Sequence, residues 1–121
     1  MTTDDAIAAA LASERTIDIT TTGRKTGKDR RIEIWFHNLD GRIFITGMPG
    51  TRGWYANVLA DPRFTFHLKE SVEADLPATA RAVRDDDERR VVLGEITSRL
   101  GRHDRLDDWL ARSPLVEVEF A

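Results

Sequence analysis

The dipeptide Asp40-Gly41 constrains the fold of this chain more than any other feature of its sequence. It separates residues 30–39, in which apolar and polar side chains alternate, from residues 42–46, which read RIFIT. An Asp-Gly pair between two such segments is a strong signal for a two-residue type I′ turn, which joins neighbouring antiparallel strands. The sequence therefore predicts a β-hairpin, and with it an antiparallel sheet.

Turns, rather than helices, join most of the other segments that have a strand pattern. Strands are predicted at residues 16–22, 30–39, 42–46, 63–69, 72–83 and 115–120. Helices are predicted at residues 3–12, 53–60, 85–100 and 103–111. Helices do not alternate regularly with the strands. The pattern therefore favours an antiparallel sheet or small barrel and disfavours a Rossmann fold. The predicted fold class is α+β and mainly β, and a length of 121 residues is typical of one domain.

Composition and motif content exclude several kinds of site. The chain has no cysteine, which excludes disulfides, thiol nucleophiles and cysteine-ligated metals. Its three histidines are far apart, and neither H-E-x-x-H nor Gly-x-Ser-x-Gly occurs, so we expect no metal site and assign no catalytic residue. No apolar segment approaches the roughly 18 residues of a membrane-spanning helix, and residues 1–12 lack the basic start of a secretory signal. We therefore expect no integral membrane segment and a cytoplasmic location.

Positive charge is concentrated in one short segment of a chain whose formal net charge is −3. Residues 23–31 contain five basic residues and a single acidic one, Asp29. The basic residues are Arg24, Lys25, Lys28, Arg30 and Arg31. A glycine-containing turn with such side chains can bind a phosphate or carboxylate through guanidinium groups and backbone N–H groups. The spacing does not match a Walker A motif. A solvated hairpin end accounts for the same charges, so charge alone leaves both interpretations open.

A second unusual stretch, residues 47–53, follows the predicted hairpin and contains three glycines. Glycines directly after a strand let a flat ligand lie close to the backbone. Trp35 and Trp54 are aromatic residues that can stack on such a ligand. The alternative is a tight connection in which Trp54 serves as a core residue.

Three segments together resemble the deazaflavin-dependent nitroreductase family, which belongs to the split β-barrel flavin and deazaflavin oxidoreductases. They are TTTGRKTGKDR at residues 20–30, Asp-Gly-Arg at 40–42 and WYANVLADPR at 54–63. The resemblance extends from about Ile17 to Phe120. It implies a six-stranded antiparallel split β-barrel with flanking helices, similar to FMN-binding barrels. Residues 1–15 would form an N-terminal helix and residues 16–121 a single cofactor-binding domain.

The resemblance also implies a cofactor and the residues that bind it. Family members use coenzyme F420, a deazaflavin whose tail carries a phosphate and an oligoglutamate chain. By motif position, Arg24, Lys25 and Arg30 bind that tail, and Thr26, Lys28 and Arg31 lie beside them. The backbone of the Gly47–Gly50 loop would lie along the deazaflavin ring, and aromatic residues would wall the pocket. The ring-binding residues implied are thus Trp35, Gly47, Met48, Pro49, Gly50 and Trp54. Asn57 matches the motif, and we expect it to have a structural capping role.

The reaction implied is hydride transfer from reduced F420 to a small unsaturated, quinone-like or nitro compound, which requires few acid–base residues in the protein. Two alternatives stay open: an FMN-dependent relative, and a non-catalytic protein that binds a cofactor, haem or lipid. A nucleic-acid binder is disfavoured because one basic segment on a chain of net charge −3 lacks a broad basic face. The expected partner is a small-molecule substrate, and a homodimer is a further expectation because split barrels often pair through an open face.

Overall fold

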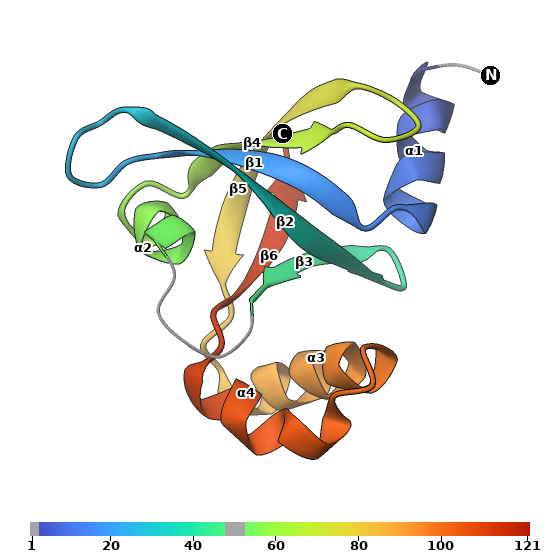
Figure 1. The fold of residues 1–121 in the computed structure, drawn as a ribbon, viewed down its shortest axis with the longest axis vertical. Helices are drawn as coiled ribbons and strands as arrows, with labels where there is room; N and C mark the ends of the chain where they lie inside the picture. The colour runs from blue at the N-terminus through green and yellow to red at the C-terminus, as the bar shows by residue number, and fades with distance from the viewer. Residues whose placement is uncertain (1–2, 48–52) are drawn as a thin grey trace.

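The computed structural model describes residues 3–47 and 53–121, and its described strands form a closed six-stranded barrel. The strands are β1 (Thr16–Thr22), β2 (Asp29–Leu39), β3 (Arg42–Thr46), β4 (Arg63–Leu68), β5 (Ala74–Ala82) and β6 (Leu115–Phe120). Their order around the barrel is β1-β2-β3-β6-β5-β4, and every pairing is antiparallel. The predicted six-stranded antiparallel barrel is therefore confirmed (Figure 1).

The β2–β3 hairpin has the turn that its sequence requires. Asp40 and Gly41 have φ angles of 54° and 90°, and a type I′ turn needs a positive φ at both central residues. The Asn38 side chain stabilises the turn, because its Oδ1 accepts a hydrogen bond from the backbone N–H of Gly41 at 2.8 Å. The turn places Leu39 opposite Arg42 and so fixes the register of the hairpin.

Alternation along the strands gives the molecule two apolar cores. Ile43 and Ile45 of β3 lie in the core inside the barrel, where the rings of Phe36 and Phe66 pack edge to face with centroids 5.3 Å apart. Phe44, between those two isoleucines, belongs to the second core. That core lies between the outer face of the barrel and the C-terminal helices, because strand residues alternate between two faces.

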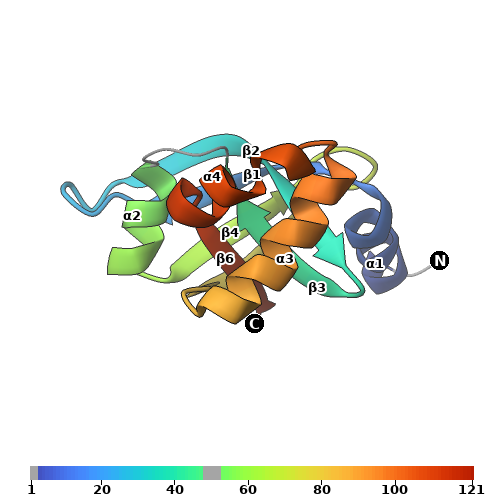
Figure 2. The same cartoon turned by 90° about the horizontal axis from the view of Figure 1, so that it is seen from below.

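Within the described residues, four α-helices surround the barrel: α1 (Thr3–Ser13), α2 (Gly53–Ala60), α3 (Asp86–Arg99) and α4 (Leu106–Arg112). Figure 1 shows α1 and α2 on opposite sides and α3 and α4 together beneath the strands, and Figure 2 shows the latter two from below. The helix predicted at residues 103–111 is instead a 3-10 turn, His103–Arg105, followed by α4. Among the described residues, no helix is long and apolar enough to cross a membrane.

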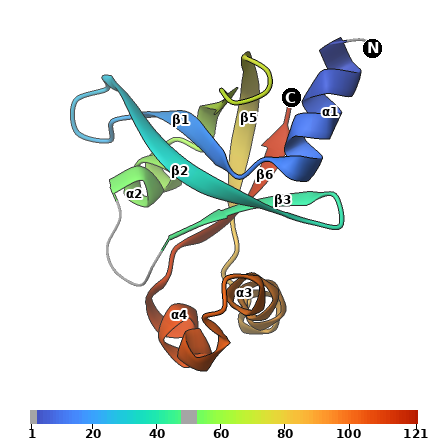
Figure 3. The same ribbon diagram turned by 45° about the vertical axis from the view of Figure 1, so that its right-hand side comes forward.

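Strand β2 changes partner halfway along its length, and this change positions the functional site. Residues Asp29–Trp35 pair with β1, whereas Phe36–Leu39 pair with β3. In the part of the chain that the structure describes, the first half of β2 thus has a strand on one side only. Figure 3 shows β2 running from the β1–β2 loop, beside α2, to the hairpin with β3. Side chains along this half of β2 therefore remain accessible, and Ile32 and Trp35 are 38% and 46% exposed.

Candidate functional site

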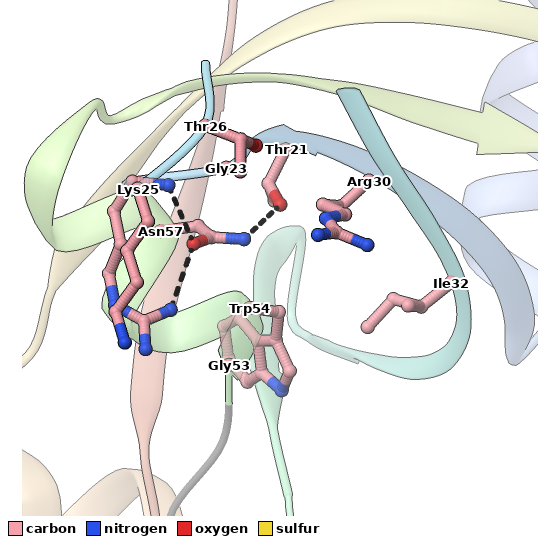
Figure 4. Close-up of a pocket in the computed structure, with 10 residues that line it drawn as sticks. Thr21, Gly23, Lys25, Thr26, Arg30, Ile32, Gly53, Trp54 and Asn57 are labelled. Carbon is pink, nitrogen blue, oxygen red and sulfur yellow. Dashed lines mark hydrogen bonds between the residues drawn. The ribbon is translucent and has the colours of Figure 1, made fainter. Parts of the chain in front are cut away.

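The β1–β2 loop and helix α2 enclose a cavity of about 380 Å³, which we call the loop cavity. It is lined by Thr21, Gly23, Arg24, Lys25, Thr26, Arg30, Ile32, Gly53, Trp54 and Asn57. Figure 4 shows Arg30 and Ile32 of β2 on one side and Trp54 and Asn57 of α2 on the other. Trp54 is 7% exposed and also packs in the barrel core. It therefore serves both as a core residue and as a wall of the cavity.

Asn57 ties the basic loop to helix α2. Its Oδ1 accepts hydrogen bonds from the backbone N and the Nη1 of Arg24, at 3.1 Å and 3.2 Å. Its Nδ2 donates to Thr21 Oγ1 at 3.1 Å, and both Asn57 and Thr21 are buried (Figure 4). An amide suits this position because it can accept and donate at the same time. The role is structural, as expected, but Asn57 lies inside α2 and its side chain binds the loop and β1 instead of capping the helix.

The loop itself is tightly built around Gly23. The backbone N–H of Gly23 donates to the carbonyl of Lys28, and that of Gly27 donates to the carbonyl of Gly23, both at 2.8 Å. A Cβ at Gly23 would lie 3.0 Å from the Lys28 carbonyl oxygen and 3.0 Å from Thr26 Oγ1. Gly27 has a φ of 71°, which residues with a side chain rarely adopt. The two glycines thus hold the basic side chains on a short turn of fixed shape.

Four cations of this loop and the adjoining start of β2, which we call the loop cations, have no counter-charge among the described residues. Within residues 3–47 and 53–121, neither Arg24, Lys25, Lys28 nor Arg30 forms an ion pair with a carboxylate, and all four are exposed. Arg31, by contrast, pairs with Asp18 at 3.0 Å. Guanidinium and ammonium groups without a carboxylate partner suit phosphate and carboxylate groups. The donor set therefore fits the phosphate and oligoglutamate of an F420 tail.

A second cavity, of about 500 Å³, lies between the outer face of β2 and β3 and the C-terminal helices, and we call it the helix cavity. It is lined by Arg15, Trp35, His37, Thr46, Gly47, Arg99, Leu100, Arg102 and Trp109. The guanidinium carbon of Arg15 lies 4.9 Å from the centroid of the Trp35 ring, a cation–π contact. Burial, and then the positive charges of Arg15 and Arg99, lower the pKa of His37 to about 4. His37 is therefore neutral near pH 7.

The structure distributes the predicted cofactor-binding residues over these two cavities. Arg24, Lys25, Thr26, Arg30 and Trp54 line the loop cavity, and Trp35 and Gly47 line the helix cavity. Lys28 lies in the same loop, where its backbone N–H donates to Thr26 Oγ1 at 3.2 Å, but it does not line the loop cavity. Met48, Pro49 and Gly50 lie outside the described residues.

Sequence reasoning missed the arginines and the histidine of the helix cavity. Arg15, His37, Arg99 and Arg102 come from segments that are far apart in the chain. The polar position of His37 opposite the apolar face of its strand was visible in the sequence, but nothing there joined it to the helix that ends at Arg99. Among the described residues, no group of three or more His, Cys, Asp or Glu side chains is placed to hold a metal ion.

Comparisons with known proteins point to the same fold. Conserved hypothetical protein Rv2991 from Mycobacterium tuberculosis aligns with a TM-score of 0.75 and 19% identity over 99% of this chain and 81% of its own. The F420-H2 dependent reductase FDR-A aligns with a TM-score of 0.60 and 22% identity, over 88% of this chain and 95% of its own. A FAD-binding protein from Mesorhizobium loti aligns with a TM-score of 0.74 and 13% identity, over 100% of this chain and 91% of its own. At these identities the likeness shows the fold alone.

The described strands form a split β-barrel, the fold that the chain shares with the FAD-binding protein and the F420-H2 dependent reductase above. A model of the F420H(2)-dependent quinone reductase family matches residues 2–116, and the chain belongs to that family. The protein is therefore an F420-dependent oxidoreductase. This membership confirms the resemblance to the deazaflavin-dependent reductases and favours F420 over FMN, and an enzyme over a non-catalytic binding protein.

Proposed function

We propose that the protein reduces a small quinone-like acceptor with F420 bound across both cavities. The anionic tail of the coenzyme lies against the cations of the loop cavity, and its ring lies toward Trp35 and Gly47. The observation that carries this proposal is the group of four loop cations without a counter-charge in the described residues. The hydrogen bonds of Asn57 fasten this loop to α2, which supports a binding role for the loop over that of a solvated hairpin end.

The residues of the chain contribute binding, orientation and exclusion of water. Arg24, Lys25 and Arg30 hold the tail by charge-assisted hydrogen bonds. Asn57 holds the loop in place before the coenzyme binds. Binding therefore costs little conformational entropy for ordering the loop. Trp54 walls the site from the core side, and Trp35 presents an exposed ring from the first half of β2.

The coenzyme, when bound in its reduced form, would supply the hydride that, together with one proton, converts a quinone to a hydroquinone, and it would itself be oxidised. Solvent can supply the proton, because the helix cavity is open to it. His37 is neutral near pH 7 and adds no further positive charge there. Unsaturated and nitro compounds are alternative acceptors that use the same hydride.

The experiment that tests the tail site compares two ligands. We expect the double variant Arg24→Gln/Lys25→Gln to bind F420 about 100-fold more weakly than the wild type, because each exposed charge-assisted contact contributes roughly 1.5 kcal/mol. Binding of a deazaflavin that lacks the tail should be unchanged. The matched control is Arg84→Gln/Arg90→Gln, which removes two exposed arginines from the start of the α3 region. Equal losses for the two ligands would contradict the assignment of the tail site.

The finer expectations about partners and location stay predictions. We infer a homodimer, because Ile32 and Trp35 expose apolar surface on the half of β2 that has one strand neighbour among the described residues. Sedimentation equilibrium tests it, with a monomer as the contrary result. The small-molecule acceptor, the absence of nucleic acid and the cytoplasmic location are inferred from the family and the charge distribution.

A further inference from the structure

The helix cavity is positively charged although the chain as a whole is acidic. Three of the residues that line it are arginines, Arg15, Arg99 and Arg102. Within the described part of the chain, no aspartate or glutamate lines it. The formal net charge of the chain is −3, so a cavity whose charged lining residues are all arginines is a local departure from the average. Such a cavity raises the local concentration of anions.

The three arginines differ in the contacts that their side chains make within the protein. Arg99 is held by Glu95 at 2.9 Å and donates to the backbone carbonyl of Asn38 at 3.0 Å. Arg15 lies over the Trp35 ring. The Arg102 side chain, in contrast, forms no hydrogen bond or ion pair with any described residue. Arg102 can therefore bind an anionic ligand without first breaking a hydrogen bond or ion pair to a described residue.

The backbone beneath Arg102 is well defined. Helix α3 ends in a Schellman motif, in which the N–H of Arg102 donates to Thr97 O at 2.7 Å and the N–H of Gly101 donates to Ser98 O at 3.2 Å. Gly101 has the positive φ, 70°, that this motif requires. The Arg102 side chain therefore extends from a fixed backbone position in the cavity wall, and only the side chain itself has to be ordered by a ligand.

The remaining walls suit a flat apolar body. Trp35 exposes 46% of its surface, Trp109 is 5% exposed at the base of the cavity, and Leu100 lies between the helices and the strands. Indole rings favour offset or edge-on contact with another aromatic ring. A volume of about 500 Å³ is within the usual size of pockets for small molecules.

We propose that the helix cavity binds planar aromatic compounds that carry an acidic substituent, a carboxylate or a sulfonate, with Arg102 as the residue that determines this specificity. In the reaction such a compound is the hydride acceptor, and that role rests on the proposed function. Binding of the compound does not depend on the proposed function, because the described residues form the cavity without the coenzyme. Neutral aromatic compounds of the same shape bind through the rings only and more weakly.

The test uses the full chain without coenzyme and calorimetric titration with two probes, a naphthoquinone sulfonate and the unsubstituted naphthoquinone. The chain has no cysteine, so neither quinone can add to a thiol. We expect the sulfonate to bind with a stoichiometry of one, and its affinity to fall on the order of tenfold or more in Arg102→Gln. Affinity for the neutral quinone should stay the same in that variant. Arg90→Gln, an exposed change of equal charge in α3, should alter neither.

Three results would overturn the inference. The first is equal affinity of wild type and Arg102→Gln for the sulfonate, with unchanged thermal unfolding. The second is loss of sulfonate binding in Arg24→Gln, which would place the anion in the loop cavity. The third is a loss of F420 affinity in Arg102→Gln as large as the loss for the sulfonate, because Arg102 would then serve the carboxylates of the coenzyme tail. Sulfonate binding that depends on Arg102 in a protein that does not bind F420 would support the cavity and refute the proposed function.

Discussion

Replacing Asn57 by alanine should detach the basic loop from α2 and lower both stability and coenzyme affinity. The amide makes two hydrogen bonds to Arg24 and one to Thr21, and it is 6% exposed. A net hydrogen bond contributes about 1 kcal/mol, and a buried polar group left without a partner costs about 1–3 kcal/mol. The bond from the exposed guanidinium counts for little, because solvent replaces it.

The expected loss of unfolding free energy is about 2–3 kcal/mol, after roughly 0.5 kcal/mol is returned by the better helix propensity of alanine. For a chain of this size the unfolding entropy is roughly 0.25 kcal/mol/K, so Tm should fall by about 8–12 °C. Thermal unfolding followed by circular dichroism measures this shift. The matched control is Leu59→Ala in the same helix, whose side chain is 44% exposed and whose loss should cost clearly less.

The coenzyme gives the second readout for Asn57→Ala. At a temperature where the variant is folded, F420 should bind more weakly than to the wild type, because the loop that carries Arg24 must be ordered by the ligand itself. A tail-less deazaflavin should bind with unchanged affinity. A Tm within about 2 °C of the wild type, together with unchanged F420 affinity, would refute the view that Asn57 holds the loop in place.

Two further predictions concern pH and backbone space. Because the pKa of His37 is lowered from 6.5 to about 4, the unfolded chain binds the additional proton in that interval, and the unfolding free energy should fall by up to about 3 kcal/mol as the pH drops through it. Urea unfolding across this range should show a shallower decline in His37→Gln, and parallel curves would contradict the expectation. Gly23→Ala should destabilise, because its Cβ would crowd two atoms of the loop at 3.0 Å, whereas Gly94→Ala, with open space around it, should stabilise α3 by about 0.5–1 kcal/mol. Chemical unfolding of both variants checks the signs, and a stabilised Gly23→Ala would contradict the close packing of the loop.

Much of the barrel could be predicted from the sequence because its signals are local. Strand alternation and the Asp40-Gly41 turn depend on neighbouring residues, and the structure confirms both. The strand predicted at residues 72–83 is shorter, Ala74–Ala82, and the last predicted helix begins as a 3-10 turn. Strand and helix ends depend on contacts with distant segments, which a local pattern does not contain.

The site was predictable to the extent that its residues share one segment. The loop cations are neighbours in sequence, so their common surface could be expected. The bond between Arg24 and Asn57 joins residues 33 positions apart, and only the motif suggested a role for Asn57. The helix cavity combines residues from the link between α1 and β1, from β2 and from the end of α3. No spacing rule connects such segments, because the fold alone brings them together.

The most direct test of the account is a titration of the purified protein with F420 and, separately, with FMN, followed by tryptophan fluorescence at low and high salt. Trp54 lines the loop cavity and Trp35 lines the helix cavity, so a bound ring should quench the signal. We predict tight F420 binding that weakens as salt screens the loop cations, and much weaker FMN binding. Equal affinity for the two ligands, or F420 binding that does not respond to salt, would contradict it.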